Sequence, residues 1–134
     1  MATVGEIMRH SVPMLTADMS MSEALDRMLD SCLSGLPVVD NQRQLIGFLS
    51  EQDCIPKLLG ASYHCDNRVV VSDLMRQDPL SITTDTDVFE LARTMGGPKP
   101  KLYPVVEGKK VIGMVTRNQF MSFLNNQLKT CLAT

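Results

Sequence analysis

Tryptophan is absent from the 134-residue sequence, and aromatic residues of all kinds make up only 4% of the chain. Few aromatic rings leave little material for the stacking surfaces on which proteins bind single-stranded nucleic acid. A charge imbalance is also lacking, because 13 Lys and Arg against 15 Asp and Glu give a formal net charge of −2. Such a chain has no strong electrostatic attraction for DNA or for an anionic membrane. We therefore expect no nucleic-acid partner.

Extended apolar segments and paired cysteines are missing as well. No uncharged apolar stretch approaches the roughly 18 residues of a membrane-spanning helix, so we expect no membrane insertion. The N-terminus has no basic region followed by an apolar one, as a signal peptide would have. None of the four cysteines (Cys32, Cys54, Cys65 and Cys131) forms a C-x-x-C pair, so we expect reduced thiols in a cytoplasmic protein. No standard spacing supports a metal site at His64 and Cys65, and we expect these two side chains to face solvent.

What the sequence does contain is an internal repeat. The aligned segments are residues 4–9 with 71–76, 37–40 with 104–107 and, after the loss of one residue, 45–50 with 111–116. A copy of about 60 residues is small for a secure core of its own. We infer that two copies pack together into one module, with repeat one at residues 1–62, a linker at 63–70 and repeat two at 71–134.

Each copy has the same expected order of elements, a short strand, a helix, two strands and a second helix. Apolar residues at helical spacing predict the first helix in each copy. They are Met21, Ala24, Leu25, Met28, Leu29 and Cys32 in copy one, and Val88, Leu91, Ala92 and Met95 in copy two. The capping patterns Ser20-x-x-Glu23 and Asp87-x-x-Glu90 mark the starts of these helices. The methionines among these residues are expected to fill the core.

The rest of each copy is expected to be a hairpin followed by a helix. Short β-branched runs at 36–39 and 45–49, and again at 103–106 and 111–115, predict the hairpins. The second helices are expected at about 51–59 and 117–128. Pro56 lies inside the first of these and should kink or shorten it. In copy two, Gly96-Gly97-Pro98 is expected to end the preceding helix.

Two motifs recur in register and carry a family resemblance. Residues 35–40 (GLPVVD) and 47–53 (GFLSEQD) of copy one correspond to 102–107 (LYPVVE) and 113–119 (GMVTRNQ) of copy two. This pattern resembles the cystathionine-β-synthase (CBS) domain, and the two copies together resemble a CBS pair, or Bateman module. The resemblance implies an α+β fold of two tandem β-α-β-β-α repeats packed with pseudo-two-fold symmetry into one globular module.

The resemblance also implies a function. It suggests a stand-alone regulatory module that binds AMP, ADP, ATP or S-adenosylmethionine in clefts between the repeats. It implies homodimerisation and control of a partner protein on another chain. No cofactor is obligatory, although Mg²⁺ would accompany ATP.

The main nucleotide cleft is expected around Ser50 and Asp53. A strand ends at Ser50 and a helix begins, so free backbone N–H groups and the hydroxyl would suit a phosphate. The Asp53 carboxylate would accept hydrogen bonds from the ribose hydroxyls. The resemblance places the purine against the opposite repeat. The implied residues are Leu80 as a wall and Leu102, Tyr103 and Pro104 along the purine. Lys101 immediately precedes this strand, and we expect it to reach a phosphate as a mobile point charge.

A purely structural role is the alternative for these polar residues, because Ser50-x-x-Asp53 is also a capping pattern. The second cleft would be formed by Gly35, Leu36, Pro37, Thr116 and Gln119. The family normally has Asp where Gln119 stands, and an uncharged amide is the weaker acceptor. We therefore expect one better nucleotide site per chain.

An enzyme is not expected, because neither histidine belongs to a recognisable nucleophile arrangement and no metal constellation is present. The alternative to a nucleotide sensor is a dimerising interaction module whose clefts hold no physiological nucleotide. The missing carboxylate at Gln119 favours that alternative, and the intact Ser50 and Asp53 pair opposes it.

Overall fold

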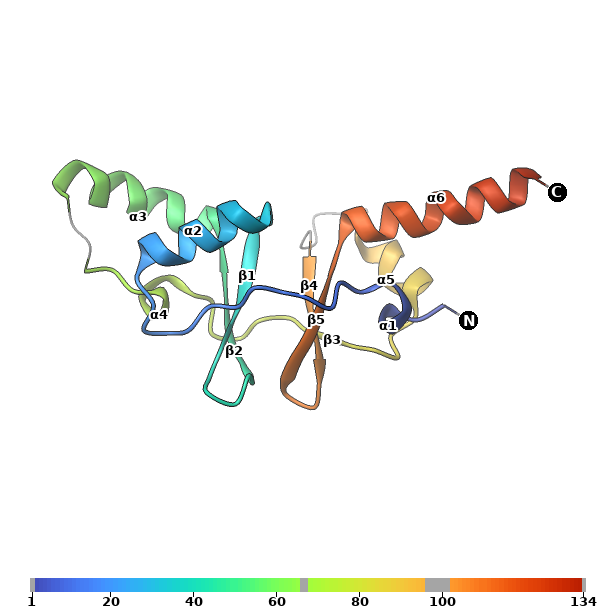
Figure 1. The fold of residues 1–134 in the computed structure, drawn as a ribbon, viewed down its shortest axis with the longest axis horizontal. Helices are drawn as coiled ribbons and strands as arrows, with labels where there is room; N and C mark the ends of the chain where they lie inside the picture. The colour runs from blue at the N-terminus through green and yellow to red at the C-terminus, as the bar shows by residue number, and fades with distance from the viewer. Residues whose placement is uncertain (1, 66–67, 96–101, 134) are drawn as a thin grey trace. The chain divides into compact units, whose positions relative to one another are not determined.

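The computed structural model describes residues 2–65, 68–95 and 102–133, and it has the alternation of helices and strands expected for two tandem repeats (Figure 1). The elements in chain order are α1 (Val4–Ile7), α2 (Met21–Ser31), β1 (Gly35–Val39), β2 (Leu45–Ser50), α3 (Glu51–His64), α4 (Val71–Leu74), β3 (Ile82–Thr83), α5 (Val88–Met95), β4 (Leu102–Glu107), β5 (Lys110–Thr116) and α6 (Arg117–Ala133). The expected α+β repeat fold is confirmed. None of the helices in the described ranges combines the length and apolarity needed to cross a bilayer.

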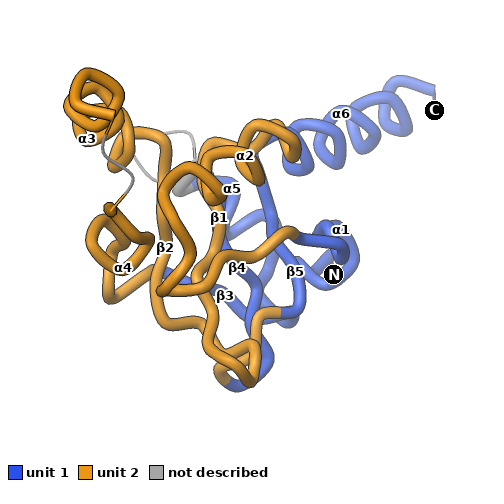
Figure 2. The backbone as a smooth tube through the Cα atoms, turned by 60° about the vertical axis from the view of Figure 1, so that its left-hand side comes forward, with its two compact units in different colours: residues 1–12, 80–108, 112–134 blue, residues 13–79, 109–111 orange. Residues whose placement is uncertain are grey.

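The chain forms two compact units that do not coincide with the sequence repeats (Figure 2). Unit 1 contains residues 1–12, 80–108 and 112–134, and unit 2 contains 13–79 and 109–111. Residues 1–12 lead into repeat one but belong to unit 1, and residues 71–79 lead into repeat two but belong to unit 2. We call these two segments the exchanged lead-ins.

In unit 2, the exchanged lead-in pairs with the first repeat through its backbone. Val71 N–H donates to the Met19 carbonyl at 2.8 Å. Phe48 of β2 and Arg76 exchange two hydrogen bonds, with N–O distances of 3.0 and 2.8 Å. Arg76 therefore adds an isolated antiparallel bridge to the β2 edge of the β1–β2 hairpin.

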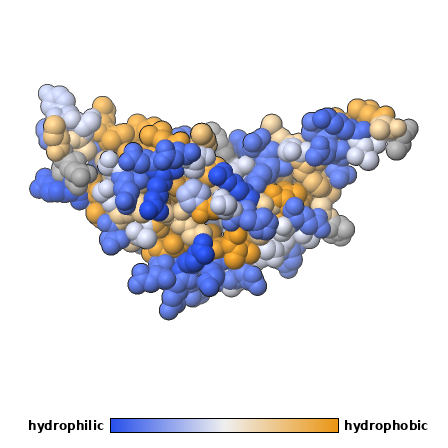
Figure 3. All heavy atoms as spheres, viewed as in Figure 1, coloured by the Kyte–Doolittle hydropathy of each residue, from blue (hydrophilic) through white to orange (hydrophobic). Residues whose placement is uncertain are grey.

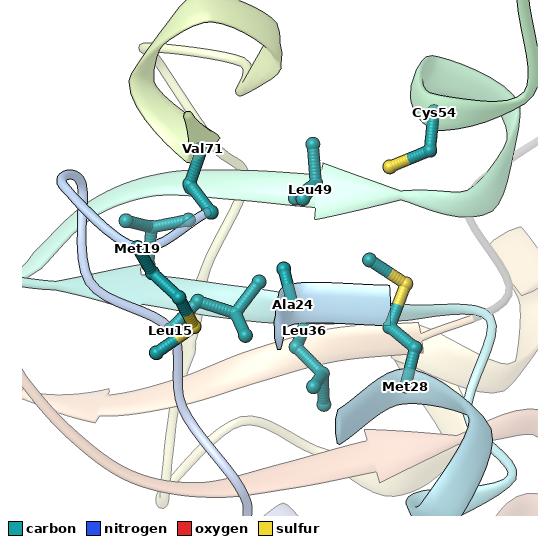
Figure 4. Close-up of a cluster of buried hydrophobic side chains, with 9 residues drawn as sticks. Leu15, Met19, Ala24, Met28, Leu36, Leu49, Cys54 and Val71 are labelled. Atoms are coloured by element: carbon teal, nitrogen blue, oxygen red, sulfur yellow. The ribbon is translucent and has the colours of Figure 1, made fainter. Parts of the chain in front are cut away.

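The sheet of unit 2 is centred on β1. Strands β1 and β2 pair antiparallel, with Gly35 opposite Ser50 and Leu36 opposite Leu49. Leu15 lies parallel on the other side of β1, so the first strand expected in this repeat is reduced to a single bridge. The buried core of this unit is formed by Leu15, Met19, Ala24, Met28, Leu36, Val38, Leu49, Cys54 and Val71 (Figure 4).

Helix α2 begins as expected but turns only part of its apolar stripe inward. The Ser20 hydroxyl oxygen accepts a hydrogen bond from Glu23 N–H at 3.1 Å, which confirms the cap. Met28 is buried, whereas Leu29 is 74% exposed. Cys32 ends the helix in the left-handed conformation with φ of 59°, so it does not continue the stripe.

Helix α3 is longer than expected. It runs for 14 residues to His64 and contains Pro56, so the expected shortening is wrong. Proline removes one backbone donor, the partner of the Gln52 carbonyl one turn earlier. Gln52 is exposed, and water can satisfy its carbonyl at little cost.

Unit 1 repeats this arrangement with a three-stranded sheet in the order β3-β4-β5. Strand β3 is parallel to β4, with Ile82 opposite Val105. The core side chains are Val4, Val88, Leu91, Tyr103, Val105, Val115 and Phe120. The exchanged lead-in contributes Val4 N–H to the Thr86 carbonyl at 2.9 Å, and Arg9 pairs in both directions with Met114 of β5 at 2.8 and 3.0 Å.

Two details of α5 bear on the sequence expectations. Glu90 accepts a hydrogen bond from Arg93 at 2.6 Å, so its carboxylate is engaged along the helix instead of reaching back toward Asp87. The residues expected to end α5, Gly96 to Pro98, lie outside the described residues. The helix itself extends to Met95.

The glycine of each Ile-Gly motif allows an exchanged lead-in to approach. A Cβ on Gly47 would lie 2.9 Å from the Arg76 carbonyl oxygen and 2.6 Å from Met75 Sδ. A Cβ on Gly113 would lie 2.8 Å from the Arg9 carbonyl oxygen. Real Cβ atoms do not come this close to a backbone oxygen. Each glycine is therefore required by the pairing of its strand with the segment from the other repeat.

Candidate functional site

The junction between β2 and α3 brings Ser50 and Asp53 together. Ser50 N–H and Ser50 Oγ–H both donate to Asp53 Oδ2, at 3.2 and 2.8 Å, and Asp53 N–H donates to Ser50 Oγ at 3.3 Å. The pair is therefore a reciprocal cap for α3, as the structural alternative predicts. Both hydrogen bonds to the carboxylate end on Oδ2. A carboxylate has about four acceptor positions, so capping and ligand binding are compatible.

Arg76 adds a positive charge to this junction. Its Nε lies 3.6 Å from Asp53 Oδ2, and the two side chains are 62% and 21% exposed. The position of Arg76 is set by its paired backbone hydrogen bonds with Phe48 of β2, two residues before Ser50. Sequence reasoning missed this residue, although the alignment of Arg9 with Arg76 between the repeats was a signal.

Cys54 closes the inner side of the junction. It extends from α3 toward Leu49 and Met28 and is fully buried (Figure 4). Burial, and secondarily the negative charge of Asp53, raise the pKa of the Cys54 thiol to about 11. The thiol is therefore protonated at neutral pH and acts as a small apolar side chain.

The structure offers little for metal coordination. Within the described ranges, no group of three His, Cys, Asp or Glu side chains could hold a metal ion. No disulfide links the four cysteines, all of which lie in the described ranges, and Cys32, Cys65 and Cys131 are exposed. The His64 ring makes an edge contact with Tyr63 at a centroid distance of 5.2 Å, and both residues are exposed, as expected for His64.

The residues expected along the purine belong to unit 1, whereas Ser50 and Asp53 belong to unit 2. Leu102, Tyr103 and Pro104 lie in β4 and are buried. The Tyr103 ring packs in the core of unit 1, so the groups it can offer to a ligand are those of its backbone. Leu80 is 61% exposed. Lys101 lies outside the described residues.

In the second expected cleft, Thr116 and Gln119 repeat the backbone contact between Ser50 and Asp53, but Gln119 carries no charge. Thr116 N–H donates to Gln119 Oε1 at 2.8 Å, so the amide copies the backbone contact of Asp53. Arg9, which corresponds to Arg76, donates from Nε to the Ser11 carbonyl at 3.2 Å. The other members, Gly35, Leu36 and Pro37, are buried in β1 of unit 2.

Comparison with known proteins places this geometry in a family. The family model for the CBS domain matches twice, at residues 4–60 and 71–126. The protein MJ1225 of Methanocaldococcus jannaschii is 29% identical over 123 residues, which is 92% of this chain and 43% of that protein. The chain thus spans less than half the length of that relative.

Solved structures agree with the family match. The CBS-pair protein CBSX2 of Arabidopsis thaliana, solved in complex with AMP, is 28% identical with a TM-score of 0.80, covering 96% of this chain and 99% of that one. A protein assigned to acetoin utilization (AcuB) from Vibrio cholerae superposes with a TM-score of 0.86 over 100% of this chain and 98% of that one. At 22% identity, the likeness to AcuB shows the fold alone.

Proposed function

Because the chain belongs to the CBS domain family and carries two such domains in tandem, we propose that it is a regulatory module for an adenosine-containing nucleotide. The ligand class is AMP, ADP, ATP or S-adenosylmethionine, and its binding modulates a partner protein. The observation that carries the proposal is the Ser50 and Asp53 pair at the start of α3. The complex of the 28% identical CBSX2 with AMP supports the same ligand class.

The chemistry of the junction suits the two ends of a nucleotide. The positive dipole end at the first turn of α3 suits a phosphate, and the Ser50 hydroxyl donates to it once it releases Asp53 Oδ2. The Asp53 carboxylate supplies acceptors for the two ribose hydroxyls. We assign the purine to Leu80, Leu102 and Pro104 and to the backbone of Tyr103, with Lys101 as a further cation.

A second ligand position is weaker in this proposal. Gln119 gives a ribose one neutral acceptor, which is already engaged by Thr116 N–H. Hydrogen bonds to a charged acceptor are roughly twice as strong as neutral ones. We therefore propose one tight nucleotide per chain. For ATP, we propose that Mg²⁺ arrives with the triphosphate.

Calorimetric titration of the chain with AMP, with Asp53→Asn beside the unmodified protein, tests the proposal. Asn keeps an acceptor for the α3 cap but loses the charge, and we expect affinity to fall about tenfold or more. The matched control is Asp73→Asn. Asp73 also caps a helix in unit 2, accepting from Val70 N–H at 3.0 Å. Equal affinity in Asp53→Asn and the unmodified chain would contradict the proposal.

A dimerising module without a nucleotide is the second candidate, and exposed apolar helix faces favour it. In α3, Ile55, Leu58, Leu59 and Tyr63 form one exposed stripe. In α6, the exposed stripe is Met121, Leu124, Leu128 and Leu132. Hydrophobic surface is visible over α2 and α3 and toward the end of α6 (Figure 3).

A thermal-shift screen separates the two candidates. A ligand that binds only the native state raises the melting temperature, by an amount set by its concentration relative to Kd. We expect a shift with at least one of AMP, ADP, ATP and S-adenosylmethionine. The absence of any shift, together with a dimer in sedimentation equilibrium, would leave the interaction module as the function.

A further inference from the structure

Arg76 reaches the Ser50 and Asp53 junction from the exchanged lead-in of unit 2. We propose that Arg76 restricts this site to adenosine ligands that carry a phosphate group. In the free protein the guanidinium neutralises Asp53. When the ribose hydroxyls occupy the carboxylate, the guanidinium turns to the phosphate. This inference rests on the proposed function, because it names the ligand class of the same site.

The backbone of Arg76 is held in place while its side chain is free to turn. Two hydrogen bonds join its backbone to Phe48, and the absence of a side chain on Gly47 lets the two segments meet. The side chain is nevertheless 62% exposed, and its contact with Asp53 is a single Nε–Oδ2 approach of 3.6 Å. An exposed pair of this kind is weak, so a ligand can replace it at little cost.

Charge explains why the Arg76 guanidinium favours ligands that carry a phosphate group. A lone carboxylate at the start of α3 would repel a phosphate bound to the same helix end. The guanidinium removes that repulsion and offers a planar pair of donors that matches a phosphate. A neutral adenosine gains nothing from it. The positive sulfonium of S-adenosylmethionine would be repelled by the Arg76 cation, whereas an unpaired Asp53 carboxylate would attract it.

The second repeat shows that the arrangement depends on Asp53. Arg9 holds the place in unit 1 that Arg76 holds in unit 2, because it makes paired backbone hydrogen bonds with Met114 of β5. Its partner position carries the neutral Gln119, and Arg9 Nε donates to the Ser11 carbonyl. Of the two junctions in the part of the chain that the structure describes, the one in unit 2 combines a charged ribose acceptor with a cation that can be released from it.

The test is calorimetry with four ligands, namely AMP, adenosine, 5′-methylthioadenosine and S-adenosylmethionine, on the unmodified chain and on Arg76→Gln. We expect the unmodified chain to bind AMP at least tenfold more tightly than the other three. In Arg76→Gln, AMP affinity should fall about 10- to 100-fold, the range of a charge-assisted hydrogen bond. Adenosine affinity should change by less than about threefold. Arg76→Lys should recover part of the loss, because it restores charge without the planar donor pair.

Two controls separate binding from folding and from net charge. Arg43→Gln removes the same charge from the exposed β1–β2 turn of unit 2 and should leave all four affinities unchanged. The melting temperature of Arg76→Gln should stay within about 3 °C of the unmodified chain, because the lost ion pair is exposed.

The outcomes also separate this inference from the proposed function. If AMP and adenosine bind the unmodified chain equally, or if Arg76→Gln weakens both by the same factor, the assignment of Arg76 is wrong and the nucleotide site stands. If none of the four compounds binds the unmodified chain, the nucleotide site itself is wrong and the role of Arg76 is refuted with it.

Discussion

Replacement of Gly47 by alanine should destabilise the protein strongly, although it adds only one methyl group. The new Cβ would meet Met75 Sδ at 2.6 Å and the Arg76 carbonyl oxygen at 2.9 Å. The thioether is flexible and can turn away. The carbonyl oxygen cannot, because it accepts the hydrogen bond from Phe48 N–H at 3.0 Å.

The size of the effect follows from these contacts. Overpacking by a methyl group costs about 1–3 kcal/mol. Moving Arg76 away also weakens its two hydrogen bonds with Phe48, each worth about 1 kcal/mol net. We expect Gly47→Ala to lower the free energy of unfolding by about 2–4 kcal/mol. For a chain of this length, that corresponds to a fall in melting temperature of roughly 10 °C.

Urea unfolding at 25 °C measures this change, and Gly60→Ala is the matched control. Gly60 lies in α3, and a Cβ there meets nothing within 4 Å. The same substitution should therefore stabilise the chain by about 0.5–1 kcal/mol, because alanine favours an exposed helix over glycine. A steric clash at Gly47 is refuted if Gly47→Ala unfolds at the same urea concentration as the unmodified chain, or if Gly60→Ala is as destabilising.

Two further predictions concern the thiols and the second junction. The exposed thiols, Cys32, Cys65 and Cys131, should react rapidly with a colorimetric thiol reagent at pH 8. Cys54 should react only on unfolding, since the thiolate forms only as the pH nears its pKa of about 11; four equally fast thiols would contradict its burial. Gln119→Asp should give the second repeat a charged ribose acceptor, so that calorimetry with AMP changes from one tight site per chain toward two. Unchanged stoichiometry would argue against Gln119 as the limiting residue.

Local patterns were sufficient to predict much of the fold. Ser20-x-x-Glu23 and Ser50-x-x-Asp53 act over a few residues, and both caps form in the structure. Pro56 shows where a local rule fails. A proline inside a helix removes one hydrogen bond, but where the freed carbonyl faces water the remaining turns still extend the helix to His64.

The parts that could not be predicted depend on which segments meet in space. Arg76 aligns with the second repeat, yet its backbone and side chain contact the first. Periodicity shows that Leu29 lies on an apolar face, but it cannot say whether anything covers that face. Tyr103 stands in a motif associated with ligands, whereas strand alternation directs its ring into the core.

The exchanged lead-ins make each half of the chain a binding partner of the other. A protein cut between its repeats would leave the edge of β2 at Phe48 without its two hydrogen bonds to Arg76, and the edge of β5 at Met114 without its two hydrogen bonds to Arg9. The two fragments would recover those hydrogen bonds only by associating, so their affinity for each other would include the free energy of folding. In the intact chain, the exchanged lead-ins couple the unfolding of the two units. A unit that unfolds must release its lead-in, and that lead-in is continuous in sequence with the other unit.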